Sequence, residues 1–288
     1  MTGWAGFGIL TACALLLVVV LQAVTFAIGH RIGRFNVVDV TWGLGFVGVA
    51  WLSLILGGGD PVRRWLLAVG VSVWGLRLAW HMVGKSKGKG EDPRYQEMLE
   101  RSGGNGLWVV ARKIFATQGA AQWFVSLPIQ VSAVAGPTPA PAWIVAALGI
   151  VVFLVGLGFE AVGDAQLRAF KADPANKGAI MDRGLWAWTR HPNYFGDASV
   201  WWGIWLVAAS SGAMTTGATV IGCPGVLTVL SPVVMTYFLV YATGARLLEK
   251  SMSRRPGYPE YQARTSYFLP RPPRSRGDAS TTATRPRP

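Results

Sequence analysis

The sequence predicts an all-helical membrane protein with about seven transmembrane helices, and three observations support this fold class. Hydrophobic residues make up 51% of the 288 residues, whereas charged residues make up only 14%. A soluble domain is typically about 25% charged, so this composition argues against a soluble fold. Seven apolar runs are long enough, or nearly long enough, to cross a bilayer. Lys and Arg also concentrate on alternate sides of these runs.

The seven apolar runs are the expected transmembrane elements. In chain order they are Phe7–Ile28, Val37–Leu56, Arg64–Val83, Gly119–Ala135, Trp143–Gly163, Ala198–Ser211 and Val220–Ala242. Pro128 interrupts the fourth run, and the sixth is short enough to suggest tilt or incomplete burial. The seventh contains two prolines, which membrane helices tolerate where neighbours satisfy the freed carbonyls. The first run lacks the basic start and the cleavage site of a signal peptide, so we expect a retained anchor.

The distribution of Lys and Arg predicts the orientation of the chain. With seven spans, one side holds 24 of these residues, the other side holds Arg63 and Arg64, and Arg77 lies within a span. Because basic loops stay in the cytoplasm, we expect the N-terminus outside and the C-terminus in the cytoplasm. This asymmetry, with an anionic cofactor, accounts for the net charge of +13 without a nucleic-acid partner.

Several common kinds of site are not expected. Cys13 and Cys223 lie in apolar runs, and the three His residues are far apart, which argues against a disulfide or a metal site. The sequence has no P-loop and no H-E-x-x-H zinc motif. The region Arg271–Pro288 is rich in Pro, Arg, Ser and Thr and predicts a disordered cytoplasmic tail. We expect residues 1–270 to form a single helical membrane domain.

Ionisable residues in the second and third runs are candidates for catalysis, because charge is costly within a membrane. Asp39 opens the second run, and Arg77 and His81 lie one helical turn apart in the third. The structural alternative is an internal ion pair between Asp39 and Arg77 that locks the two helices together.

A polar stripe follows the fifth run. Two acidic and then two basic side chains recur at steps of four, four and three residues: Glu160, Asp164, Arg168 and Lys171. At about 100° per residue they share one helix face. The carboxylates suit ribose hydroxyls or a carboxamide, and the basic end suits phosphate. The alternative is pairing of Asp164 with Arg168 within the helix, worth only a few tenths of a kcal/mol.

Two further polar segments flank the last two runs. The first, Arg190–Asp197, crowds Arg, His, Asn, Tyr and Asp into eight residues, with Pro192 to fix a turn and Gly196 to permit close backbone approach. An interfacial belt of aromatic residues is the alternative. The second predicts an amphipathic helix, a turn and an aromatic segment at the membrane surface, and it comprises Arg246–Lys250, Gly257–Tyr261 and Tyr267–Pro270.

In this order, these segments resemble the steroid 5-alpha-reductase superfamily, specifically its bacterial branch. The resemblance extends from about Asp39 to Pro270 and includes Trp74–His81 and Glu91–Tyr95. Its sharpest part is the run Arg190–Tyr194, with the sequence Arg-His-Pro-Asn-Tyr. Sterol reductases share this run, and isoprenylcysteine carboxyl methyltransferases carry a similar Arg-His-Pro with a later Glu and Tyr.

The resemblance implies a seven-span enzyme of a bacterial inner membrane. It implies that NADPH is held on the cytoplasmic side, mainly by residues 158–270, and reduces a polarised carbon–carbon double bond of a lipid-like substrate. The implied cofactor contacts are Lys87, Lys89, Glu160, Asp164, Arg168, Lys171, Arg190, His191, Asn193, Tyr194, Arg246 and Glu249. The candidates to polarise or protonate the substrate are Asp39, Arg77 and His81.

One departure separates this chain from the steroid reductases themselves. Those enzymes carry an adjacent Gln-Glu pair on the second span and a Tyr on the third, whereas this chain has Asp39 and no Tyr in the third run. The resemblance therefore implies a reductase scaffold without implying a steroid substrate.

The sequence also allows two functions other than that of a reductase. An S-adenosylmethionine-dependent methyltransferase of the isoprenylcysteine type would need no basic groups for a 2′-phosphate, so the stripe and the nearby lysines favour NADPH. A non-enzymatic lipid-binding or transport protein would leave the stripe without a role. The expected partners are a lipid-like small molecule and membrane lipids, and we expect a monomer.

Overall fold

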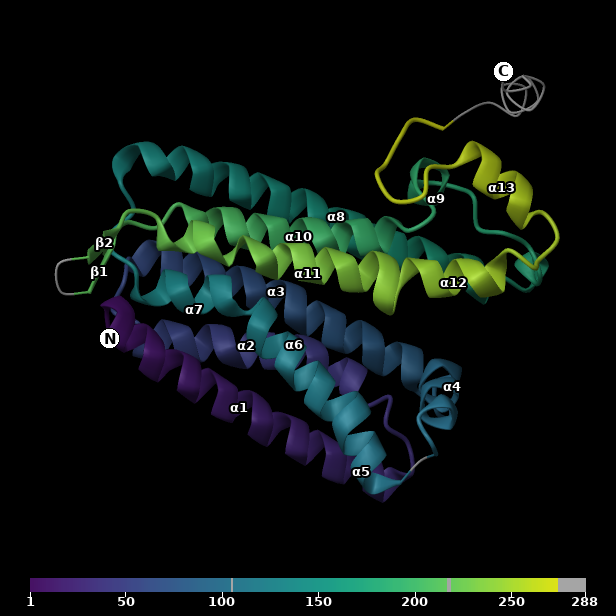
Figure 1. Cartoon of the computed structure of the whole chain (residues 1–288). Coiled ribbons are helices and arrows are strands. Elements are labelled where there is room, and N and C mark those ends of the chain that lie inside the picture. Colours follow the sequence, from purple (N-terminus) through teal and green to yellow (C-terminus); the bar gives the residue numbers. More distant parts are fainter. Residues whose placement is uncertain (105, 217–218, 274–288) are drawn as a thin grey trace, which may run out of the picture. The chain divides into compact units, whose positions relative to one another are not determined.

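The computed structural model describes residues 1–104, 106–216 and 219–273, and these residues are mostly helical, with one short pair of strands (Figure 1). Among them, five helical segments are long and apolar enough to cross a membrane. They are Gly3–Ile32, Val38–Leu56, Pro61–Ser86, Ala140–Ala172 and Pro224–Met252. The predicted fold class, a helical polytopic membrane protein, is thus confirmed, and the five segments match five of the expected runs.

The chain divides into two compact units. Unit 1 comprises Met1–Leu148 with Ile204–Ser231, and unit 2 comprises Gly149–Gly203 with Pro232–Pro288. The expectation that residues 1–270 act as one domain stays a prediction. Most of the predicted tail, residues 274–288, lies outside the described residues.

Unit 1 is built on three long helices that pack against several shorter ones. The elements are α1 (Gly3–Ile32), α2 (Val38–Leu56), α3 (Pro61–Ser86), α4 (Pro93–Arg101), α5 (Leu107–Val110), η1 (Ala111–Ala116), α6 (Thr117–Val125), α7 (Leu127–Val134), η2 (Ala140–Ala142), β1 (Met214–Thr216), β2 (Thr219–Ile221) and η4 (Pro224–Val229). Strands β1 and β2 form a short antiparallel hairpin. The fourth apolar run is not one helix, because α6 ends at Val125, Ser126 separates it from α7, and Pro128 lies in the first turn of α7.

Helices α2 and α3 approach closely at a pair of glycines. A Cβ atom added to Gly75 on α3 would lie only 2.7 Å from the carbonyl oxygen of Gly43 on α2. Gly43 also begins a G-x-G-x-x-G run that ends at Gly48. In dinucleotide-binding domains such a run follows a strand and opens a helix. Here it lies within a membrane helix, where Gly43 serves helix packing.

A buried arginine holds one end of unit 1 together. Arg63 is fully buried and donates to the hydroxyls of Ser132 (2.8 Å) and Thr138 (2.6 Å). It also donates to the main-chain carbonyls of Ser132, Ala135 and Gly136. Asp60 accepts the N–H groups of Arg63 and Thr138. Burial works to raise the pKa of Asp60, but these hydrogen bonds and the Arg63 charge outweigh it and lower the pKa.

Unit 2 carries the polar stripe and both polar segments that flank the last apolar runs. Its elements are α8 (Trp143–Ala172, from Gly149 onward), η3 (Pro174–Asn176), α9 (Leu185–Trp188), α10 (Pro192–Ala209, up to Gly203), α11 (Leu230–Tyr237, from Pro232), η5 (Phe238–Ala242), α12 (Ala245–Met252) and α13 (Tyr258–Arg264). Helices α8 and α10 meet where Gly156 faces Gly196, since a Cβ atom on Gly196 would lie 2.5 Å from the Gly156 carbonyl oxygen. The close backbone approach expected at Gly196 is therefore present.

Candidate functional site

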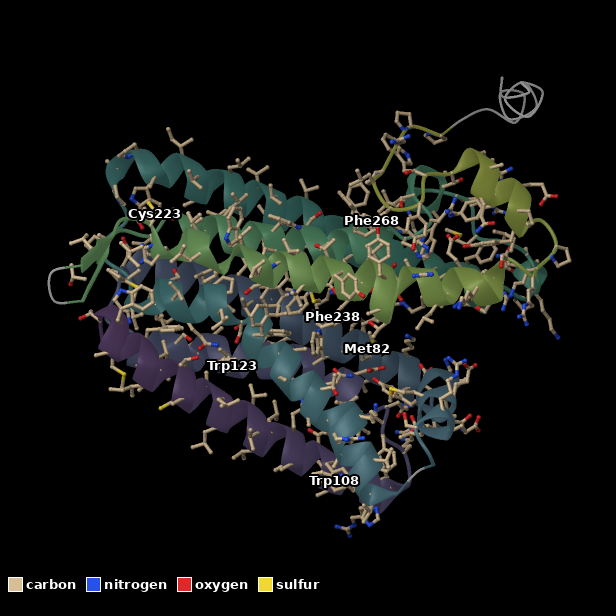
Figure 2. The ribbon with its side chains drawn as sticks, in the orientation of Figure 1. Met82, Trp108, Trp123, Cys223, Phe238 and Phe268 are labelled. Atoms are coloured by element: carbon tan, nitrogen blue, oxygen red, sulfur yellow. The ribbon has the colours of Figure 1, made fainter. Side chains whose placement is uncertain are left out.

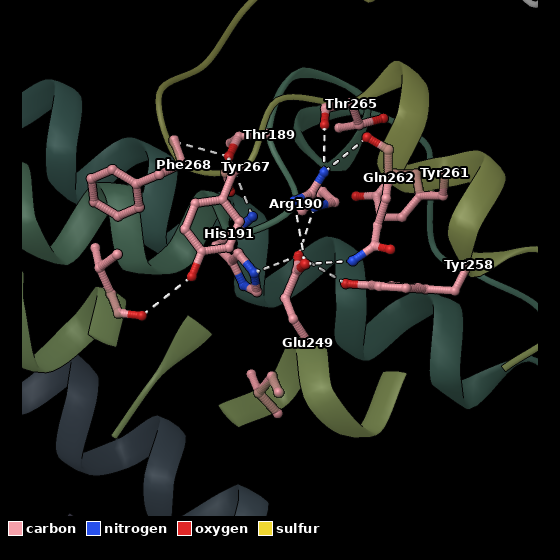
Figure 3. Close-up of polar contacts among 12 residues, drawn as sticks. Thr189, Arg190, His191, Glu249, Tyr258, Tyr261, Gln262, Thr265, Tyr267 and Phe268 are labelled. Atoms are coloured by element: carbon pink, nitrogen blue, oxygen red, sulfur yellow. Dashed lines mark hydrogen bonds and ion pairs between the residues drawn. The ribbon is translucent and has the colours of Figure 1, made fainter. Parts of the chain in front are cut away.

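Glu249, on α12, is the centre of a polar cluster in unit 2 (Figure 3). Its Oε1 accepts from Nε of Arg190 at 2.6 Å and from the Tyr258 hydroxyl at 3.2 Å, and it lies 3.2 Å from Nε2 of His191. Its Oε2 accepts from Nη2 of Arg190 at 3.2 Å and from the Gln262 amide at 2.6 Å. The Arg190–Glu249 pair is thus a two-pronged ion pair, which is a strong and directional kind of contact.

Arg190 is held on its other sides by the C-terminal part of the chain. Its Nη1 donates to the carbonyls of Gln262 and Thr265, both at 2.9 Å, and its main-chain N–H donates to the Ser266 carbonyl at 2.9 Å. The guanidinium carbon lies 5.3 Å from the centre of the Tyr267 ring. The side chains of Arg190 and Glu249 are only 11% and 13% exposed, so water screens this pair weakly.

The segment Tyr258–Arg271, here called the C-terminal strap, also binds the residues before Arg190. The Tyr261 hydroxyl donates to the Trp186 carbonyl at 2.6 Å, and the Thr189 hydroxyl donates to the Phe268 carbonyl at 2.9 Å. Burial, the nearby Glu249 charge and its hydrogen bond raise the pKa of Tyr258. Burial and then the neighbouring Tyr258 raise the pKa of Tyr261. The strap is therefore an integral part of unit 2.

The predicted stripe on α8 runs from buried acids to exposed bases. Glu160 and Asp164 are 3% and 6% exposed, whereas Arg168 and Lys171 are exposed. Asn193 donates through Nδ2 to Oδ1 of Asp164 at 3.3 Å, which joins the stripe to the start of α10. The spacing argument predicted the common helix face, and the contact with Asn193 ties two predicted motifs together.

The remaining predicted residues of unit 2 surround the same region. The imidazole of His191 is buried and stacks on the Tyr194 ring, with the ring centres 5.7 Å apart and an interplanar angle of 16°. The Tyr267 ring meets His191 edge-on at 5.5 Å. Arg246 is exposed and lies on α12, one turn before Glu249.

Five predicted site residues belong to unit 1, namely Asp39, Arg77, His81, Lys87 and Lys89. Asp39, in the first turn of α2, accepts a hydrogen bond from the Tyr95 hydroxyl at 2.5 Å. The amide of Gln118 donates to the same hydroxyl at 3.1 Å. Arg77 and His81 are half-buried on α3.

The two predicted lysines lie just beyond α3, in a loop that the main chain organises. Lys87 and Lys89 are exposed, and the carbonyl of Lys89 accepts from Nη1 of Arg34 at 2.7 Å. The Glu91 carboxylate accepts the main-chain N–H groups of Phe35 and Asn36. The loop is therefore fixed by its backbone, which leaves both ammonium groups exposed.

Sequence reasoning missed Tyr95 as a partner of Asp39. Tyr95 belongs to α4, a short helix outside the apolar runs, so no hydropathy pattern connects it with the start of α2. The available signal was helical spacing, because Tyr95 and Leu99 lie four residues apart and both pack in one apolar cluster with Val38.

Comparison with known proteins places the chain in a superfamily of membrane proteins. Residues 25–265 match the family described as "Protein of unknown function (DUF1295)". That family falls within the membrane superfamily of steroid 5-alpha-reductase-like proteins and methyltransferases. A stretch of 66 residues is 41% identical to "Probable O-methyltransferase ustE" of Ustilaginoidea virens. The stretch covers 23% of this chain and 22% of that protein. No solved structure matches the chain.

Proposed function

Because the chain belongs to the DUF1295 family, we propose that it is a membrane enzyme that uses NADPH to reduce a carbon–carbon double bond in a lipid-like substrate. The observation that carries this proposal is the stripe on α8. Buried carboxylates at Glu160 and Asp164 are followed on the same face by exposed cations at Arg168 and Lys171. This order of groups fits a ligand with a hydroxyl-rich or amide-bearing part and a phosphate-bearing part.

In this proposal, residues of unit 2 bind the cofactor and hold its site in shape. Asp164 accepts a hydrogen bond from the cofactor, and Asn193 orients the Asp164 carboxylate for that contact. Arg168 and Lys171 bind phosphate. When bound, NADPH supplies the hydride, and the protein supplies orientation and exclusion of water. Arg190 and Glu249 act as positioning residues, because each already satisfies the other within the cluster.

In unit 1, Asp39, Arg77 and His81 stay the candidates to polarise the substrate or to supply its proton. The Tyr95 hydroxyl joins them, since it donates to Asp39 while accepting from Gln118. We infer that the enzyme is a monomer in a bacterial inner membrane with its C-terminus in the cytoplasm, where NADPH is available.

A second candidate function is favoured by one finding. The 66-residue match to a probable O-methyltransferase supports an S-adenosylmethionine-dependent methyl transfer. S-adenosylmethionine carries no phosphate, so under this function Arg168 and Lys171 have no cofactor group to bind. The two functions therefore differ in the nucleotide that the protein recognises.

The deciding experiment is a thermal-shift comparison of NADPH, NADH and S-adenosylmethionine with the detergent-purified full-length protein. A ligand that binds only the folded state raises the midpoint of unfolding. We expect the largest rise with NADPH, and we expect Asp164→Asn to reduce it. Glu260→Gln, which changes an exposed carboxylate of unit 2, serves as the matched control and should keep the full shift. A rise with S-adenosylmethionine alone would replace the reductase with the methyltransferase.

A further inference from the structure

We propose that unit 1 binds the headgroup of an anionic phospholipid at a surface formed by Arg31, Ile32, Trp108, Arg112 and Lys113, here called the basic rim. All five side chains are exposed. The rim lies where the last turn of α1 meets α5 and η1 (Figure 2 labels Trp108 there). This interaction is separate from the cofactor and the substrate discussed above.

Aromatic packing fixes the two halves of the rim beside each other. The rings of Phe26 on α1 and Phe115 on η1 meet edge-on, with their centres 5.3 Å apart. Arg31 lies five residues beyond Phe26, about 8 Å along the helix at 1.5 Å per residue. Arg112 and Lys113 lie within one turn of Phe115. The three cations are therefore held at one end of unit 1 by a packed aromatic core.

The length of α1 places this end at the level of lipid headgroups. The helix has 30 residues, which corresponds to about 45 Å. The hydrocarbon core of a bilayer is about 30 Å thick and the bilayer with its headgroups about 40–45 Å. Arg31 and Ile32 end this helix, and Trp108 on α5, directly before η1, is 75% exposed. Tryptophan is enriched at this depth because its ring is apolar and its N–H is polar.

Local charge favours an anionic headgroup over a zwitterionic one. No Asp or Glu occurs in residues 1–38 or 101–135, which include both halves of the rim. Two acidic residues that lie between these segments in sequence contact other groups: Glu91 accepts the N–H groups of Phe35 and Asn36, and Glu97 pairs with Arg101. The rim cations therefore have no acidic neighbour in either segment, and a phosphodiester of net negative charge supplies the missing anion.

The competing explanation is that these cations only direct membrane topology. A topology signal is indifferent to which lipid surrounds the folded protein, whereas a headgroup site distinguishes anionic from zwitterionic lipid. Each basic side chain near a membrane surface changes affinity for anionic lipid roughly fivefold, so three should change it on the order of 100-fold.

The test uses the purified full-length protein in detergent, titrated with dioleoylphosphatidylglycerol or dioleoylphosphatidylcholine while the unfolding midpoint is measured. We expect phosphatidylglycerol to raise the midpoint more than phosphatidylcholine, and high salt to shrink the difference. The triple variant Arg31→Gln/Arg112→Gln/Lys113→Gln should lose the difference. The matched control Arg254→Gln/Arg255→Gln, which neutralises two exposed arginines of unit 2, should retain it.

Two outcomes would overturn the proposal: equal responses to the two lipids in the native protein, or an unchanged preference in the triple variant. A third arm uses sn-glycerol 3-phosphate, and an equal shift with this soluble phosphate would exclude a lipid as the ligand. Should the triple variant fail to fold, Trp108→Phe gives a second measurement. The difference in fluorescence between the wild type and this variant is the emission of Trp108. This emission should be quenched several-fold more by dibrominated phosphatidylglycerol than by dibrominated phosphatidylcholine, and equal quenching would refute the site.

Discussion

At the scale of single residues, the charged groups of Glu249 and Arg190 are hydrogen-bonded to other groups of the protein. Both carboxylate oxygens accept hydrogen bonds from protein groups, and Arg190 is in turn bound by main-chain carbonyls of the C-terminal strap. Removing one partner of a buried ion pair destabilises a protein far more than removing one partner of a surface pair, because the remaining ion stays out of water. The free energy of unfolding should therefore fall strongly when a substitution removes or exchanges a single polar atom of this cluster.

Glu249→Gln should destabilise the protein by about 3–5 kcal/mol, because it leaves the Arg190 guanidinium buried without its counter-charge. The thermal midpoint in detergent would fall by many degrees. Glu260→Gln, at an exposed position, should change stability by less than about 0.5 kcal/mol. Similar midpoints for the two variants would contradict the structural role given to Glu249.

Tyr258→Phe should cost about 1 kcal/mol near neutral pH, through its lost hydrogen bond to Glu249. The pKa of Tyr258 is raised above 10 in the folded protein, so the neutral phenol stabilises the fold below pH 10. This stabilisation is lost as the pH rises above the ordinary value toward the raised one. Midpoints measured between about pH 8 and 11 should thus bring wild type and variant closer together. A deficit of constant size across this range would show that Tyr258 does not titrate as described.

At the scale of elements, α8 and α10 are matched by small residues at their contact. Gly196 faces the backbone of α8 at Gly156 and Glu160, whereas Gly158 has open space where a side chain would project. Gly196 and Gly158 therefore differ in their tolerance of an added methyl group, and this makes a sharp test of the helix contact.

Gly196→Ala should destabilise the protein by about 1–3 kcal/mol, because the added methyl group meets backbone atoms of α8. Gly158→Ala should be neutral or stabilise by up to about 1 kcal/mol, since it lowers the entropy of the unfolded chain. Unfolding midpoints of both variants check this pair. Equal losses in the two would indicate that α8 and α10 do not pack through Gly196.

Elements could be predicted from the sequence where one local property decided them. The helices that contain Phe7–Ile28 and Trp143–Gly163 followed from unbroken apolar length. The stripe on α8 followed from spacing alone. The break at Ser126 was visible only as Pro128, and the pairing of Arg190 with Glu249 was not visible at all. These two residues are 59 positions apart, and a tertiary contact at that separation leaves no periodic trace in a single sequence.

At the scale of the whole molecule, basic residues should set the orientation in the membrane. We expect Ala140 to face outward and Ala179 to face the cytoplasm, from the 24-to-2 division of Lys and Arg. Both positions are exposed. In a background with Cys13→Ser and Cys223→Ser, an impermeant maleimide on intact bacterial cells should label Ala140→Cys. Ala179→Cys should be labelled only after lysis, and its labelling in intact cells would reverse the topology.

The order of synthesis gives the Arg190 cluster one more consequence. The groups that bind the Arg190 side chain, the Glu249 carboxylate and the carbonyls of Gln262 and Thr265, follow it by 59, 72 and 75 residues, so they leave the ribosome well after the arginine does. During that interval the growing chain holds a cation whose anion has not yet been translated. Any product stopped before residue 249 keeps that exposed defect permanently and becomes a substrate for membrane quality control. Late nonsense mutations should therefore remove the protein from the cell and leave no shortened, partly active form.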